Sequence, residues 1–144
     1  VSRAKIKSFD ARAVAKSYII SAKYGEALSV LSKVSLKEQS SHWILYRKSQ
    51  ALLGLGKSIT HPGGEEHIAM ALSCAERALE NALEDTKAKG RISIYYELRS
   101  QCLLAKKEYE LAKEDLVMAI ELCKDDKYLE DLKHRLQSME LEVA

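Results

Sequence analysis

Apolar residues recur along most of the chain at intervals of three and four, the period of an α-helix with one buried face. Strand-like alternation is not sustained anywhere in the sequence. The pattern predicts an all-α fold of about seven helices, near residues 11–22, 25–34, 43–55, 65–87, 93–104, 109–123 and 128–144. Because most joins between them are short, neighbouring helices are expected to pack antiparallel in pairs.

Polar, Gly and Pro residues predict where these helices begin and end. Asp10 is expected to cap the first helix, and Tyr24–Gly25 marks the first turn. Residues 35–41 predict a polar break. Gly54-Leu55-Gly56 predicts the end of the third helix, since glycine commonly follows a helix C-terminus. Residues 57–64, KSITHPGG, predict an irregular loop because Pro and paired Gly disfavour regular structure.

A block of sequence repeats along the chain. Lys48–Leu53, KSQALL, recurs as Arg99–Leu104, RSQCLL. The first helix of each pair carries a small residue near its middle, and the second carries one near its start. These positions are Ala15, Ser49 and Ser100, which face Ala27, Ala71 and Ala112. Small facing side chains let two helix backbones cross closely, so the pattern predicts three stacked helical hairpins.

This repeat resembles the tetratricopeptide repeat (TPR) family in a divergent form. Ala15 and Ser49 are 34 positions apart, which is the period of that family. Lys48 and Arg99 stand where the family prefers Leu, and no Pro closes a repeat. The resemblance implies a right-handed α-α superhelix. It implies one domain over residues 1–144, with repeats at about 9–35, 41–89 (inserted loop 57–64) and 92–124, and a capping helix at about 127–144.

In TPR-like folds the first helix of each hairpin lines the concave surface, so the resemblance implies a groove that binds a partner. The residues that it places in the groove are Phe9, Arg12, Lys16, Ile19, Trp43, Tyr46, Arg47, Gln50, Leu53, Ile94, Glu97, Leu98, Gln101 and Leu104. Aromatic and arginine side chains beside amides are the usual anchors of a bound chain. Trp43 could equally be a core residue between the first two repeats.

One TPR sub-type, the two-carboxylate clamp that holds chaperone C-terminal tails, is poorly matched. The clamp requires Lys and Asn on the first helix, Asn on the second, and Lys and Arg on the third. The corresponding positions here are Arg12, Lys16, Arg47, Ile94 and Leu98. The amides are replaced by cations and the last two cations by apolar residues, which predicts no strong binding of such tails.

Charge is unevenly spread, whereas candidate catalytic chemistry is missing. Residues 1–62 carry 11 Lys/Arg against 3 Asp/Glu, and residues 63–144 carry 12 against 18. Such a division can orient a partner by its field, although differently solvated faces explain it as well. Histidines and cysteines lack metal-ligand spacing, and Gly54–Ser58 resembles only the end of a phosphate-binding loop. We therefore expect no enzyme activity, no cofactor and no metal.

These observations favour a protein-interaction scaffold or adaptor that binds an extended peptide or helix of another protein within a complex. A second hypothesis is RNA or DNA binding by the basic first half, through phosphate contacts and base stacking. Its residues would be Arg3, Lys5, Lys7, Arg12, Lys16, Arg47 and Lys48, with Phe9 and Trp43. A third is a non-catalytic accessory domain of a larger enzyme, which a chain starting at Val1 without Met would suit.

The expected location is intracellular, cytoplasmic or nuclear. The three cysteines, Cys74, Cys102 and Cys123, are widely spaced in helical apolar patterns, which suits a reducing compartment. No secretory signal is visible, and no apolar run is long enough to span a bilayer, so we expect no membrane association.

Overall fold

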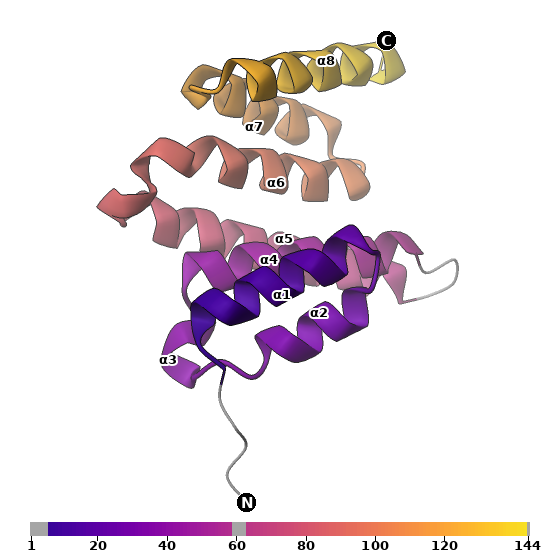
Figure 1. The fold of residues 1–144 in the computed structure, drawn as a ribbon. Helices are drawn as coiled ribbons and strands as arrows, with labels where there is room; N and C mark the ends of the chain where they lie inside the picture. The colour runs from indigo at the N-terminus through magenta and orange to yellow at the C-terminus, as the bar shows by residue number, and fades with distance from the viewer. Residues whose placement is uncertain (1–5, 59–62, 144) are drawn as a thin grey trace, which may run out of the picture.

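The computed structural model describes residues 6–58 and 63–143, and within them all regular structure is helical. The helices are α1 (Ser8–Ile20), α2 (Tyr24–Leu31), α3 (Leu36–Gln39), α4 (His42–Ser58), α5 (Gly64–Leu83), the 3-10 helix η1 (Thr86–Arg91), α6 (Ile92–Ala105), α7 (Tyr109–Leu122) and α8 (Asp126–Val143). The predicted all-α class is confirmed. Figure 1 shows α4 to α8 stacked in sequence order, with α1, α2 and α3 at the end opposite α8.

The stack has no single central core. Three clusters of buried apolar side chains follow one another: one joins α1, α2 and α4, the next joins α4, α5, η1 and α6, and the last joins α6, α7 and α8. The longer helices therefore bury their apolar faces against helices that are close to them in the sequence. This nearest-neighbour packing is typical of helical repeats.

The predicted contacts between small residues are confirmed. The Ser49 hydroxyl donates a hydrogen bond to the Ala71 carbonyl at 2.7 Å, and the Ser100 hydroxyl donates one to the Ala112 carbonyl at the same distance. The equivalent residues of the first hairpin, including Ala15, are fully buried alanines in one cluster. Each hydroxyl can sit at the helix crossing because a carbonyl of the facing helix accepts its proton.

The turns after α1 and α6 share one geometry. Ala22 and Lys107 both have a left-handed backbone, with φ of 59° and 65°. In each turn the next residue's N–H bonds the carbonyl five positions back, which together with a second bond defines a Schellman motif. The two residues are 85 positions apart, the same separation as Ala15 and Ser100. The first turn thus precedes Tyr24, which begins α2, so the predicted Tyr24–Gly25 turn is wrong.

Two predicted helix ends are also wrong. α1 begins at Ser8, so Asp10 lies in its first turn, where a carboxylate favours the positive helix end without capping it. α4 continues through Gly54 and Gly56 to Ser58. A Cβ at Gly54 would lie 2.3 Å from the Tyr24 ring, and one at Gly56 would lie 2.8 Å from a carbonyl oxygen of α5. These glycines therefore permit close packing of α4 instead of ending it.

The segments between the hairpins are more regular than predicted. The polar break at residues 35–41 contains the short helix α3. α5 ends at Leu83 and not near Lys87, because Asp85 starts η1 by accepting a hydrogen bond from the Lys87 N–H at 3.0 Å. Of the predicted loop at 57–64, both ends belong to helices, and residues 59–62 lie outside the described part of the chain.

Candidate partner-binding groove

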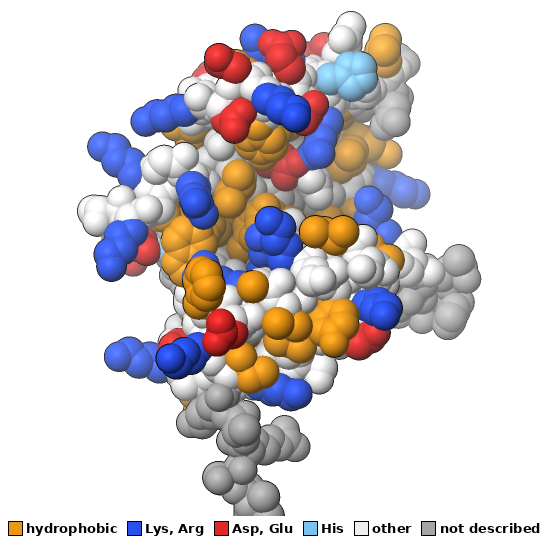
Figure 2. All heavy atoms as spheres, viewed as in Figure 1, with side chains coloured by type: hydrophobic (Ala, Val, Ile, Leu, Met, Phe, Trp, Pro, Cys, Tyr) orange, Lys and Arg blue, Asp and Glu red, His pale blue; other side chains and the backbone are white. Residues whose placement is uncertain are grey.

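Two hollows lie along the face that α1, α4, α6 and α8 form. The larger has a volume of about 780 Å³ and is bounded by α4, η1, α6, α8 and the loop before α8. The smaller, about 290 Å³, lies between Ile19 of α1, Tyr24 of α2, and residues of α4 and α6. Gln50 and Gln101 line both hollows, so the hollows adjoin at these two side chains, and we call the two hollows together the groove. In Figure 2, hydrophobic and basic side chains lie in the recessed region between α1 and α8.

An aromatic cluster, Trp43, Tyr46 and Tyr95, lies at the α4 side of the groove. The Tyr46 and Tyr95 rings meet edge to face at 5.3 Å between centroids, and Trp43 lies 6.4 Å from Tyr95. Tyr95 is 1% exposed, whereas Trp43 and Tyr46 are half-buried. Tyr46 lines the larger hollow. The cluster therefore has a core side, Tyr95, and a groove side, Tyr46.

Three guanidinium groups cover the outer faces of these rings, and we call Arg12, Arg47 and Arg91 the arginine cluster. Arg12 lies 5.1 Å and Arg91 5.8 Å from the Trp43 ring centroid. Arg47 lies 5.2 Å from the Tyr46 ring, and its Nη1 donates to the Gln50 side chain at 2.8 Å. The stacking is the arrangement of a cation–π contact. It places positive charge beside the groove.

The surroundings of Arg47 make its positive charge less favourable than it would be in water. Burial lowers the pKa of Arg47; Tyr46 opposes this effect, and the positive charge of Arg12 adds a smaller lowering effect. The Arg12 Nε atom is buried and has no hydrogen-bond partner among the described residues. Burial raises the pKa of both Tyr46 and Tyr95, so the phenols stay neutral and supply no counter-charge.

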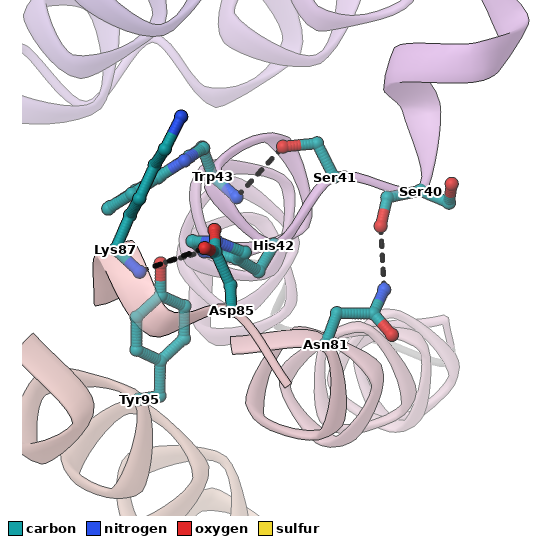
Figure 3. A network of polar contacts seen from close by, with 8 residues as sticks. All are labelled: Ser40, Ser41, His42, Trp43, Asn81, Asp85, Lys87 and Tyr95. Carbon is teal, nitrogen blue, oxygen red and sulfur yellow. Dashed lines mark hydrogen bonds and ion pairs between the residues drawn. The ribbon is translucent and has the colours of Figure 1, made fainter. Parts of the chain in front are cut away.

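A buried polar network fixes the aromatic cluster from behind (Figure 3). The His42 Nε2–H donates to the Asp85 carboxylate at 2.7 Å, which leaves Nδ1 to accept the Tyr95 hydroxyl proton at 2.6 Å. The bond from His42 lowers the pKa of Asp85. The network joins the start of α4 to the start of η1 and to α6. Because the Tyr95 phenol is buried, the network positions Trp43 and Tyr95 and offers no reactive group to the groove.

Leu98, which was also predicted to lie in the groove, is 1% exposed and belongs to the central core cluster, so that prediction is wrong. Two further predicted contact residues, Leu53 and Glu97, are mainly internal. Leu53 is 5% exposed and packs in the central cluster, with only an edge on the smaller hollow. Glu97 is 7% exposed, and its Oε1 accepts hydrogen bonds from Gln101 and from Arg135 of α8. The expectation that both present free side chains is corrected, because one completes the core and the other is already neutralised.

Of the other predicted contact residues, some line the groove and some lie beside it. Ile19 and Gln50 line the smaller hollow, and Gln101 lines both hollows. Phe9 is 72% exposed at the start of α1, with Arg12 5.6 Å from its ring. Lys16 is exposed on α1 and is not among the residues lining a hollow. Their role in binding stays a prediction.

Sequence reasoning missed the groove residues that η1 and α8 supply. Arg91 joins the arginine cluster, and Tyr128 and Arg135 line the larger hollow. Tyr128 and Arg135 are seven positions apart, two helical turns, so their shared face was a readable signal. The sequence around Arg91 does not indicate that its side chain reaches Trp43, because the path of the 3-10 helix η1 determines where that side chain lies.

The described residues include neither a metal-binding cluster nor a helix able to span a membrane. They hold no group of three His, Cys, Asp or Glu side chains placed to bind a metal ion. None of the described helices combines the length and the hydropathy needed to cross a membrane.

Comparison of the chain with protein-family models finds no match, and comparison with curated proteins finds no relative.

Proposed function

We propose that this chain is a protein-binding module, a TPR-like scaffold or adaptor that holds a segment of another protein in the groove. The observation that carries the proposal is that the two hollows adjoin at Gln50 and Gln101, beside half-buried aromatic and arginine side chains. Exposed edges of Tyr, Trp and Arg in a concave surface are typical of binding hot spots. A groove that crosses several helices suits an extended chain better than a small molecule.

The proposal includes no catalytic step. The His42–Asp85–Tyr95 network brings three titratable side chains together on this side of the molecule, and its Tyr95 is 1% exposed. A nucleophile or general acid must reach its substrate within hydrogen-bond distance. A buried network whose members already satisfy one another is better explained as support for the groove.

Nucleic-acid binding is the weaker proposal for the same face. Arg3 and Lys5, which that hypothesis needs, lie outside the described residues. Lys48, which it also needs, is not among the residues lining either hollow. Asp125 lines the larger hollow. A polyanion following the whole groove would meet this carboxylate.

The test blocks the groove at the point where its two parts join. A library of random peptides displayed on phage is selected against the chain, and affinities of the recovered peptides are measured by fluorescence anisotropy. Gln50→Trp should lower those affinities at least tenfold by filling the junction. Glu110→Trp, an equal change at an exposed position of α7, is the matched control. Equal binding to both variants, with unchanged circular dichroism, would place the binding surface elsewhere.

A further inference from the structure

Three positive charges converge on one side of the groove from different parts of the chain. Arg12 comes from α1, Arg47 from α4 and Arg91 from η1. Two of them contact the same Trp43 ring, at 5.1 and 5.8 Å. The third, Arg47, lies 5.2 Å from the Tyr46 ring, which belongs to the same aromatic cluster. Tertiary folding therefore creates this concentration of charge.

Two other arginines differ from the arginine cluster because each has a carboxylate partner. Arg99 binds both carboxylate oxygens of Asp115 at 2.7 Å. Arg135 pairs with Glu97. Among the described residues, no ion pair includes a member of the arginine cluster. The described part of the fold thus supplies a counter-ion to Arg99 and to Arg135 and none to the three half-buried or groove-lining arginines of the cluster.

The geometry leaves donors of the arginine cluster unused. A guanidinium has five N–H donors in a planar fork that matches a carboxylate. Arg47 uses one on Gln50, and Arg12 has a buried Nε without a hydrogen-bond partner among the described residues. Partial burial removes water from these groups, while the aromatic faces offer no hydrogen-bond acceptor oxygen. An incoming carboxylate would supply both the missing charge and the missing acceptors.

We infer that the arginine cluster binds carboxylate side chains of an acidic segment in the partner protein. The inference deepens the proposed function and rests on it, because it specifies the chemistry of the segment that the groove holds. An Asp or Glu side chain enters between Arg12 and Arg47, and Arg91 contacts the same or the next carboxylate. Apolar side chains of the same segment then lie along the groove against Tyr46 and Ile94.

A short acidic segment fits this surface better than a nucleic acid does. The arginine cluster lies on the side near Trp43, whereas the part of the larger hollow next to α8 is lined by both Asp125 and Lys124. A polynucleotide carries a negative charge on every residue and needs basic side chains along its path. A peptide can place its carboxylates at one end and neutral residues at the other.

The experiment uses the displayed peptide library as its probe and the intact chain as its target. Peptides recovered on the wild type should be enriched in Asp and Glu. Replacing those acids by Asn and Gln in the synthetic peptides should weaken binding at least tenfold. Arg47→Gln should have a similar effect, and Arg91→Gln, at an exposed position, should weaken binding without any effect on folding. Arg77→Gln on α5 removes the same charge outside the groove and should leave affinity unchanged.

The outcomes separate this inference from the proposed function. If recovered peptides are neutral or basic but Gln50→Trp still abolishes their binding, the groove binds peptides and the acidic inference is wrong. If Gln50→Trp has no effect, both fail. If a fluorescent single-stranded oligonucleotide binds and loses affinity in Arg47→Gln, while acidic peptides do not bind, the cluster recognises phosphate on a nucleic acid and the inference is overturned. Circular dichroism of each variant verifies that the fold is intact.

Discussion

The contact between α4 and α5 at Gly56 gives a sharp test of the packing. An alanine Cβ there would lie 2.8 Å from the Gly64 carbonyl oxygen, 2.7 Å from Ile68 Cγ1 and 3.1 Å from the Ile68 backbone nitrogen. Ordinary contacts of a Cβ are 3.4–4 Å. Two of these three neighbours are backbone atoms, which no side-chain rotation can move. Gly56→Ala therefore requires the two helices to separate.

The expected loss of stability follows from two opposing effects. Overpacking a well-packed contact costs about 1–3 kcal/mol. Alanine is favoured over glycine inside a helix by about 1 kcal/mol, which offsets part of this cost. Because the obstruction at Gly56 is backbone, we expect the upper part of the range and a net loss of about 1–2 kcal/mol in the free energy of unfolding. Urea denaturation followed by far-ultraviolet circular dichroism measures it.

Gly25 provides the matched control, since it lies in α2 and nothing is within 4 Å of an added Cβ. Gly25→Ala should stabilise the chain by about 0.5–1 kcal/mol. Gly54→Ala should fall between the two, because its obstruction is the Tyr24 ring, a half-buried side chain that can move. If Gly56→Ala is as stabilising as Gly25→Ala, the close approach of α4 and α5 is refuted.

Two further predictions concern the turns and the polar network. Ala22→Gly and Lys107→Gly should each stabilise the fold by about 0.5–1 kcal/mol in the same denaturation assay, because glycine adopts the left-handed backbone without steric cost; destabilisation would contradict the turn geometry. The hydrogen bond from His42 holds the pKa of Asp85 below its ordinary 3.8, so its stabilisation is present at neutral pH and is lost as the pH falls through and below that value. The stability difference between wild type and Asp85→Asn should therefore shrink below pH 3.8 in a series of unfolding curves, and a difference that does not vary with pH would exclude this role.

The sequence by itself determined the helices and their pairing. The spacing of apolar residues reflects one buried face per helix, a property of each segment that needs no knowledge of the partner. The small residues Ser49 and Ser100 likewise indicated, from the sequence alone, where α4 crosses α5 and where α6 crosses α7. Only a small residue fits where two backbones approach, and the structure confirms those contacts with Ala71 and Ala112.

Local rules failed where a tertiary contact changed the meaning of a residue. Glycine commonly ends a helix, but Gly54 and Gly56 lie inside α4 because neighbouring helices occupy the space a side chain would take. Glu97 was predicted to be free for a partner, yet Arg135, 38 positions later, pairs with it. Neither contact could be read from the sequence near the residue.

Only the tertiary structure decided the composition of the groove. Arg12, Arg47 and Arg91 are separated by 35 and 44 positions, and no periodicity relates them. They meet because α1, α4 and η1 stack around Trp43, so their proximity depends on helix crossing angles and on the direction of a short 3-10 helix. Such geometry results from side-chain packing between distant segments, whereas a sequence pattern records only which face of each segment is buried.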